Sequence, residues 1–118
     1  MKLEPSLVEG TYTFHSTTGR IPAAHVQAIV VEDEGTTVVL EVAEAEKLEL
    51  EHTGRFAWIT LGAVTDLAAV GITAKVSGVL AEAGIACNVL AGFHHDHLLV
   101  PVDRGDEALG LIAEIELR

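Results

Sequence analysis

The feature that most constrains the fold is an amphipathic helix pattern that follows directly on a strand pattern. In "GITAKVSGVLAEAG" (71–84), apolar residues recur at helical spacing and would form one buried stripe: Ile72, Val76, Val79, Leu80 and Ala83. Gly84 stands where a helix commonly ends, because glycine adopts the conformation of a C-terminal cap without strain. The preceding segment "RFAWITLGA" (55–63) predicts a strand. A strand therefore leads into a helix near the centre of the chain.

The segments after this helix predict two more strands and a second helix. "IACNVLAG" (85–92) and "HLLVPV" (97–102) both have the apolar composition of strands. Asp103 is expected to be the N-cap of the next helix, whose buried stripe would be Ala108, Leu111, Ile112 and Ile115. Residues 56–115 thus have the order β-α-β-β-α, which is most of a ferredoxin-like βαββαβ unit of the α+β class.

The first half of the chain is predicted to consist mainly of strands. "GTYTFHS" (10–16) alternates between two faces, as a strand does. "HVQAIVVEDEGTTVVLEVAEA" (25–45) contains two β-branched runs joined by a turn that ends at Gly35, which predicts a hairpin. "AEAEKLELEH" (43–52) fits a short helix, although its leucines also alternate as in a strand.

The charge of the chain excludes some classes of partner. Eighteen acidic residues stand against seven basic ones, for a formal net charge of −11. Such a field repels phosphate groups, so we expect neither a nucleic acid nor an anionic membrane as a partner. The acidity by itself is explained by solubility.

The ends of the chain and its single cysteine predict a soluble cytoplasmic protein. "MKLEPSLVEG" at the start has no apolar run of signal-peptide length, and no segment approaches the length of a membrane span. Cys87 cannot form an internal disulfide and is expected to face the core as a small apolar side chain. Ser77 lies within a helix, and no GxSxG, P-loop or GxGxxG motif is present. We therefore assign no catalytic residue and no cofactor, and expect a protein that is not an enzyme.

Three of the six histidines lie in "GFHHDHLLVP" (92–101). On an extended strand, His95 and His97 would share one face, and His94 and Asp96 the other. Neither face offers the three or four ligands that a zinc or iron site needs, unless a histidine from the first half joins them. No HExxH or CxxC motif is present, so no metal ligand is assigned. This corner is either a contact for a ligand or interface, or a plain polar end of a hairpin.

The junction between strand and helix, "LGAVTDLAAVGITAKVSGVL" (61–80), offers a candidate ligand site. The first N–H groups of a helix have no internal acceptors and bind carboxylates well. Gly71 would let a ligand approach the backbone, Thr73 adds a hydroxyl, and Asp66 could accept an ammonium group. In the alternative interpretation, Asp66 caps a turn and Gly71 only permits a bend.

Small residues on the back of this helix suggest a close contact with a second element. Ala74, Ser77, Gly78 and Ala81 lie roughly opposite the apolar stripe. Glycine inside a helix costs about 1 kcal/mol relative to alanine, so Gly78 would be explained by close approach of the first half or of another subunit. A harmless alanine-rich surface is the other interpretation.

Two stretches of the second half carry a resemblance to a known family. "VGITAKVSGVLAEAGIACNVLAG" resembles the strand–helix–strand core of an ACT domain, a small regulatory module that senses amino acids. The continuation "CNVLAGFHHDHLLVPVDRGDEAL" resembles a bacterial group of stand-alone ACT-like proteins, distantly similar to the CASTOR-type arginine sensors. The resemblance is strong across 56–113 and looser across 8–55. It implies two tandem ACT-like halves, with a degenerate first half at 1–54 and an ACT domain at 55–118.

The resemblance also implies where a ligand would bind. In ACT domains, the loop between the first strand and the first helix usually holds the amino acid, together with a facing strand of a partner unit. Carried over to this chain, the ligand-binding positions are Thr65, Asp66, Val70, Gly71, Ile72 and Thr73, with Asn88 on the next strand. The corner His95-Asp96-His97 matches the motif of the bacterial group, which does not reveal what that corner does. No first helix is visible between Phe14 and Val26, which leaves a ligand site in the first half in doubt.

We expect a sensor that binds an amino acid or a related metabolite reversibly and passes the signal to a separate protein target. Homo-oligomers are an expected form, because ACT units act by changing their contacts with one another. The first alternative is a dimerising interaction module that needs no ligand. The second is a metal-dependent enzyme at the His94–His97 corner.

Overall fold

The structure, a computed structural model, describes residues 2–21, 25–63 and 70–117. The chain forms two compact units. One unit comprises Met1–Glu9 together with Phe56–Arg118, and the other comprises Gly10–Arg55. The first nine residues therefore pack with the second half of the chain rather than with the segment that follows them.

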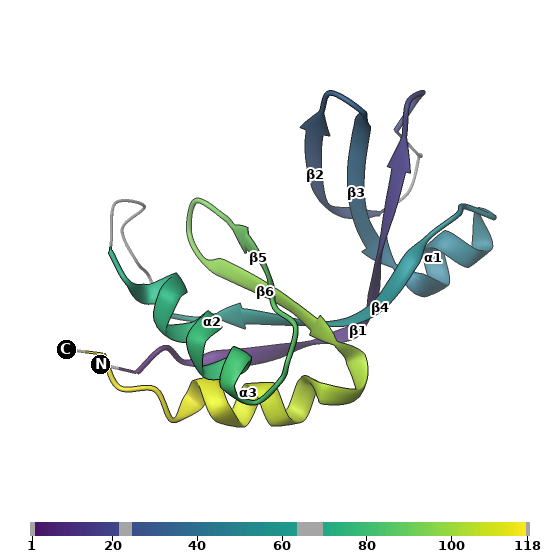
Figure 1. Ribbon diagram of the computed structural model, residues 1–118. Coiled ribbons are helices and arrows are strands. Elements are labelled where there is room, and N and C mark those ends of the chain that lie inside the picture. The colour runs from purple at the N-terminus through teal and green to yellow at the C-terminus, as the bar shows by residue number, and fades with distance from the viewer. Residues whose placement is uncertain (1, 22–24, 64–69, 118) are drawn as a thin grey trace. The chain divides into compact units, whose positions relative to one another are not determined.

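The sheet has six strands in the order β2-β3-β1-β4-β6-β5 (Figure 1). The elements along the chain are β1 (Pro5–Thr17), β2 (Val26–Glu32), β3 (Gly35–Glu41), α1 (Val42–Lys47), β4 (Thr53–Leu61), α2 (Ile72–Glu82), β5 (Asn88–Ala91), β6 (Asp96–Pro101), η1 (Val102–Arg104) and α3 (Gly105–Ala113). The pairs β1·β3, β2·β3, β4·β6 and β5·β6 are antiparallel. This is the predicted α+β architecture.

The core of the larger unit lies between one face of its strands and the helices α2 and α3 (Figure 1). Strand alternation directs Ile59 of β4 and Leu98 of β6 toward the helices. Val76 and Leu80 of the predicted α2 stripe meet them and are buried. The helical spacing in the sequence thus identified the buried face of α2 correctly.

The N-terminal residues complete the larger unit beside β4. The N–H of Ala63 donates to the carbonyl of Leu3 at 3.1 Å, and the N–H of Gly62 donates to that of Glu4 at 2.8 Å. Leu3 is 0 % exposed and belongs to the core cluster of this unit. The start of the chain therefore supplies the backbone partner that a ferredoxin-like unit otherwise takes from its last strand.

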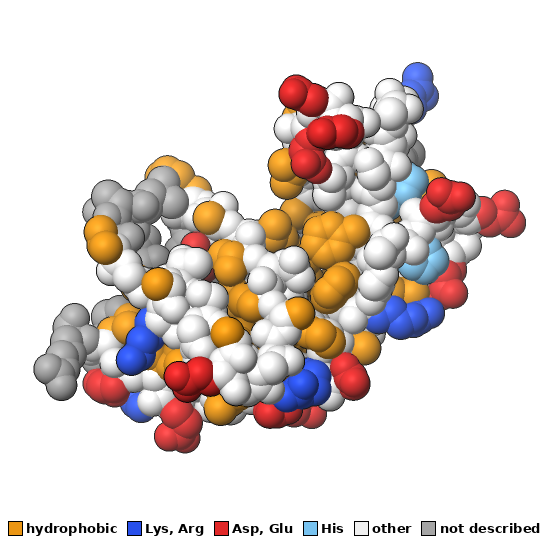
Figure 2. Space-filling view, viewed as in Figure 1, with side chains coloured by type: hydrophobic (Ala, Val, Ile, Leu, Met, Phe, Trp, Pro, Cys, Tyr) orange, Lys and Arg blue, Asp and Glu red, His pale blue; other side chains and the backbone are white. Residues whose placement is uncertain are grey.

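The smaller unit confirms the predicted hairpin and short helix. The strands β2 and β3 pair through Glu32 and Gly35 at the turn, and Gly35 has a φ of 153°. Between them, "DE" forms a two-residue turn of exposed acidic side chains, and Figure 2 shows acidic side chains gathered at the tip of this hairpin. The helix α1 forms over residues 42–47, where the sequence also allowed a strand, because Ala45 packs against Val38 and Leu40.

Two predicted boundaries in the second half were wrong. The strand expected at 85–92 is shorter, because the N–H of Ile85 donates to the carbonyl of Leu80 at 2.9 Å and holds the chain at the end of α2. Asp103 is not the N-cap of α3. It lies in the 3₁₀ turn η1, and Arg104 is the capping residue. Close packing sets this start, since a Cβ added at Gly105 would lie 2.8 Å from that of Ala57.

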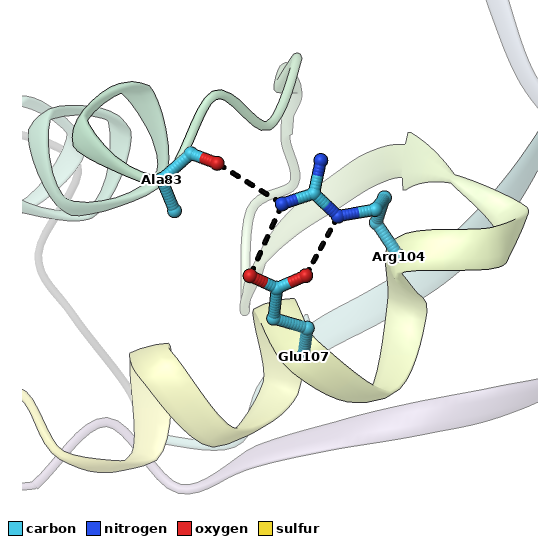
Figure 3. Close-up of polar contacts among 3 residues, drawn as sticks. All are labelled: Ala83, Arg104 and Glu107. Carbon is cyan, nitrogen blue, oxygen red and sulfur yellow. Dashed lines mark hydrogen bonds and ion pairs between the residues drawn. The ribbon is translucent and has the colours of Figure 1, made fainter.

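A single arginine links the ends of the two helices (Figure 3). Arg104 donates to both carboxylate oxygens of Glu107, at 2.6 and 3.1 Å, and to the carbonyl of Ala83 at 3.0 Å. The carbonyl is one that the end of α2 leaves without a helical donor. The hydrogen bonds from Arg104 also lower the pKa of Glu107. Arg104 therefore connects the end of α2 to the first turn of α3.

In the described residues, no helix is long and apolar enough to cross a membrane.

Candidate functional site at the start of α2 and the neighbouring histidine corner

The start of α2 has the geometry of an open helix N-terminus. Gly71 is its N-cap residue, with a left-handed φ of 92°, and makes no side-chain capping bond. The N–H of Lys75 donates to the carbonyl of Gly71 at 2.9 Å, which begins the helical ladder. The earlier N–H groups of a helix have no such acceptor. This end of α2 can therefore bind an anionic group.

The residues on either side of Gly71 differ in what they face. Val70 is 95 % exposed and Thr73 is exposed, whereas Ile72 packs against the core. A Cβ added at Gly71 would meet no described atom within 4 Å. Positive φ and not lack of space therefore requires glycine here. Thr65 and Asp66, the other predicted positions of this loop, lie outside the described residues.

Asn88 lies in the edge strand β5 and not in the loop before α2. It is exposed and stands opposite Leu99 in β6, where its side-chain amide donates to the Leu99 carbonyl at 3.4 Å. Within the described ranges, no hydrogen bond joins Asn88 to residues 70–73. The structure thus brings Val70, Gly71, Ile72 and Thr73 together, and gives Asn88 a role in strand pairing.

The histidine corner is the tight connection between β5 and β6. The N–H of Gly92 donates to the carbonyl of His95 at 3.0 Å, and a Cβ at Gly92 would lie 2.7 Å from that oxygen. The ring of His94 packs edge-on against Phe93, whose side chain is 77 % exposed. Glycine is therefore needed at residue 92, because a side chain there would clash with the His95 carbonyl. Phe93 and His94 give the corner an aromatic surface that faces solvent.

His97 belongs to a polar cluster on the face of the sheet opposite the helices. Its Nδ1 lies 3.3 Å from the indole nitrogen of Trp58 and 3.0 Å from the hydroxyl of Thr60. The indole N–H can only donate, and it lies within hydrogen-bond distance of both Nδ1 of His97 and the Thr60 hydroxyl, at 3.3 and 3.2 Å. A neutral imidazole with its proton on Nε2 accepts the indole N–H at Nδ1. Burial lowers the pKa of His97, neighbouring His95 lowers it further, and the Asp96 carboxylate partly opposes both.

Sequence reasoning missed Trp58 and Thr60 as partners of His97. Thr60 stands opposite His97 in the pairing of β4 with β6, and Trp58 lies two residues away on the same face. The strands are separated by 34 residues that contain α2 and β5, and no local pattern reveals which residues pair across that distance. Only the register of β4 against β6 identifies them.

The corner does not form a metal site from the described residues. Among residues 2–21, 25–63 and 70–117, no group of three histidine, cysteine or acidic side chains could hold an ion. His95 shows one unusual feature, since its Nδ1 is buried without a hydrogen-bond partner among those residues.

Cys87 packs against the core as predicted, and burial raises the pKa of its thiol. A thiol held protonated is a weak nucleophile and a poor metal ligand.

The small residues on the back of α2 are accessible in this chain. Ala74, Gly78 and Ala81 are exposed, and a Cβ at Gly78 would meet no described atom within 4 Å. The hydroxyl of Ser77 donates to the carbonyl of Ala74 at 3.3 Å, so its hydrogen-bond acceptor lies within the same helix. The ridge thus has no close neighbour among the described residues.

Lowering the pH below about 6.5, the usual histidine value, is expected to destabilise the larger unit. Burial lowers the pKa of His97 in the folded state, so the unfolded chain takes up a proton first and stability falls as the pH drops. Above that range both states are neutral at His97 and its full contribution is present. Urea unfolding, followed by the fluorescence of the single tryptophan Trp58, measures this dependence.

The matched variants for this prediction are His97→Asn and His94→Asn. Asparagine at 97 keeps an acceptor near Trp58 but does not titrate, so its unfolding free energy should lose part of the pH slope. His94 is exposed, and its variant should retain the slope of the wild type. An unchanged slope in His97→Asn would show that His97 does not cause it.

Comparison with known proteins gives two matches to the ACT domain, one at residues 1–57 and one at 51–112. A protein of unknown function from Vibrio cholerae, described as a possible transport protein, is 37 % identical over 94 % of this chain and 88 % of that one, with a TM-score of 0.87. No curated protein matches the chain.

Two more distant structures share the fold. A protein from Agrobacterium tumefaciens is 21 % identical, with a TM-score of 0.79 over 96 % of this chain and 88 % of that one. The ligand-free regulatory subunit of aspartate kinase from Thermus thermophilus is 14 % identical, with a TM-score of 0.70 over 96 % and 97 % of the two chains. With its two domain matches and its Vibrio relative, this chain belongs to the ACT-domain family and carries two ACT domains in tandem.

Proposed function

We propose that this protein is a sensor that binds a small amino acid or a related metabolite reversibly and catalyses no reaction itself. The N–H groups at the start of α2, around residues 71–73, take the ligand carboxylate. Asp66 or a backbone carbonyl takes the ammonium group. Binding changes the contacts of the protein with its partners, so that a separate target receives the signal.

The observation that carries this proposal is the conformation of Gly71. ACT domains are typically regulatory modules that bind ligands, and both halves of this chain match them. Gly71 opens α2 in a left-handed conformation with no side-chain cap, and no described atom lies within 4 Å of a Cβ added there. An uncapped helix start of this kind suits a carboxylate, because its N–H groups and the helix dipole both favour negative charge.

A thermal-shift screen against the twenty amino acids tests the proposal. A ligand present at 100 times its Kd is expected to stabilise the protein by about 2.7 kcal/mol. For a domain of this size the unfolding midpoint should rise by several degrees. Asp66→Ala and Gly71→Val should both remove the shift while leaving the protein folded. A shift that survives in both variants would place the ligand elsewhere.

Gly84→Val is the matched control for Gly71→Val. Gly84 ends the same helix with a φ of 72°, and like Gly71 it has no described atom within 4 Å of an added Cβ. Valine at either position imposes comparable backbone strain, so both variants should lose stability. Only Gly71→Val should lose the response to the ligand.

The alternative function, a dimerising module that needs no ligand, is favoured by the exposed ridge of Ala74, Gly78 and Ala81. It predicts the same assembly state with and without amino acids. Gly78→Leu should then dissociate the assembly in sedimentation measurements, because a large side chain prevents close helix approach. Under the sensor hypothesis this variant keeps its ligand-dependent thermal shift.

A further inference from the structure

The smaller unit contains an open groove that neither the histidine corner nor the start of α2 includes. It has a volume of about 480 Å³ and lies between β1 and the segment that connects α1 to β4. Its lining residues are Phe14, Ser16, Leu50, Glu51, His52 and Thr53. A volume of this size is typical of pockets for small molecules. Figure 2 shows histidine and acidic side chains on the surface of the smaller unit.

The wall formed by residues 50–53 is held in place by side chains. His15 donates from Nδ1 to the carbonyl of Glu51 at 2.7 Å, and Thr13 donates its hydroxyl to the carbonyl of Thr53 at 3.0 Å. The Nδ1 of His52 donates to the carbonyl of Leu50 at 2.9 Å. The segment that leads into β4 is thus fixed at three carbonyls, those of Leu50, Glu51 and Thr53. This preforms the groove and reduces the conformational entropy lost when a ligand binds.

The hydrogen bond to Leu50 also decides which ring nitrogen of His52 is left to accept a hydrogen bond. A backbone carbonyl can only accept, so Nδ1 of His52 carries the proton. In the neutral ring, Nε2 then has a lone pair available to accept a hydrogen bond. Together with the carboxylate of exposed Glu51 and the hydroxyls of Ser16 and Thr53, the groove is supplied mainly with acceptors.

The charge of the groove lining is acidic, through Glu51, among the described residues. No lysine or arginine is among its lining residues in the described part of the chain. Phe14 offers a ring face, which attracts organic cations, and Leu50 adds apolar surface. The net charge of −11 favours a cation further.

We propose that this groove is a binding site for a small organic cation, namely a primary ammonium ion attached to an apolar body. Glu51 and the Nε2 of His52 accept hydrogen bonds from the ammonium group. Phe14 and Leu50 contact the apolar body. This site is separate from the one proposed at residues 71–73, which takes a carboxylate, and either can exist without the other.

Calorimetric titration with three probes of similar shape tests the charge preference. Phenethylammonium should bind, neutral phenylethanol should bind more weakly, and anionic phenylpropionate should not bind. Amide chemical shifts recorded during the titration should change at residues 14–16 and 50–53. Glu51→Gln should raise the Kd for phenethylammonium about tenfold or more, because it removes a charged hydrogen-bond partner.

The control is Glu34→Gln at the exposed tip of the β2–β3 hairpin, outside the groove. It changes the net charge equally and should leave the Kd unchanged, which separates a specific carboxylate from general attraction. Glu51 is exposed, so its variant is expected to fold, and the unfolding midpoint checks this. The inference is overturned if phenethylammonium does not bind, if phenylpropionate binds as well, or if Glu51→Gln behaves like Glu34→Gln. Shifts confined to residues 70–73 would also overturn it, without affecting the proposed amino-acid site.

Discussion

Replacing Leu80 by alanine is expected to lower the free energy of unfolding by about 2–5 kcal/mol. Leu80 is 0 % exposed and shares the core cluster of the larger unit with Ile59 and Ile112. Its truncation removes apolar contacts from both the sheet and α3 and leaves a cavity that close-packed neighbours fill only in part. Denaturant unfolding measured by Trp58 fluorescence reports on this unit directly, since Trp58 lies in it.

Gly78→Ala on the same helix is a control whose effect on stability should have the opposite sign. Gly78 is exposed in the interior of α2 and an added Cβ would meet no described atom. Alanine should therefore stabilise the protein by about 0.5–1 kcal/mol through helix propensity alone. If Leu80→Ala lowered the free energy of unfolding by less than Gly78→Ala raised it, the described packing of α2 on the core would be wrong.

The second large effect is expected at the N-terminal segment, where Gly62→Ala should cost about 1–3 kcal/mol. A Cβ at residue 62 would lie 2.7 Å from the carbonyl oxygen of Glu4, a backbone atom that cannot move aside cheaply. The same carbonyl accepts the N–H of Gly62, so the clash disrupts the pairing of the N-terminus with β4. Urea unfolding of the wild type and of Gly62→Ala measures this change in the free energy of unfolding.

Leu3→Ala tests the same contact from the other side and should cost about 2–5 kcal/mol, because Leu3 is fully buried. Both substitutions act by loosening the same segment, so the double variant should cost less than the sum of the single ones. Strict additivity would mean that Gly62 and Leu3 act independently. The docking of the N-terminus would then not be one cooperative contact.

Much of the fold was predictable because it follows from local patterns. The buried stripe of α2, the hairpin at Gly35 and the strand β4 depend on the spacing of apolar residues and on glycine at turns. The tandem ACT-like architecture is confirmed by matches in both halves of the chain. The error at the start of β5 came from a local hydrogen bond, in which the N–H of Ile85 holds the chain at the end of α2. The error at Asp103 came where a contact distant in sequence decides how a helix begins. Gly105 against Ala57 is one such contact.

The candidate sites were predictable to different degrees. Gly71 was predicted to open the helix, and it is the N-cap residue of α2 in a left-handed conformation. The partners of His97 were not identified, since Trp58 and Thr60 reach it only through strand register. The groove beside Phe14 was missed altogether, because it forms between segments that the sequence separates by more than thirty residues.

The sequence by itself determined the types of element, the face that each buries and the family to which the chain belongs. The elements and their buried faces follow from periodicity and from glycine positions, which act over a few residues, whereas the family follows from the resemblance of the second half to ACT domains. The tertiary structure alone decided that residues 3 and 4 pair with 62 and 63, that His97 lies against Trp58 and Thr60, and that three side chains fix the wall of the groove. Each of these depends on backbone and side-chain groups brought together by packing, and the energy that holds them appears only once the chain has folded.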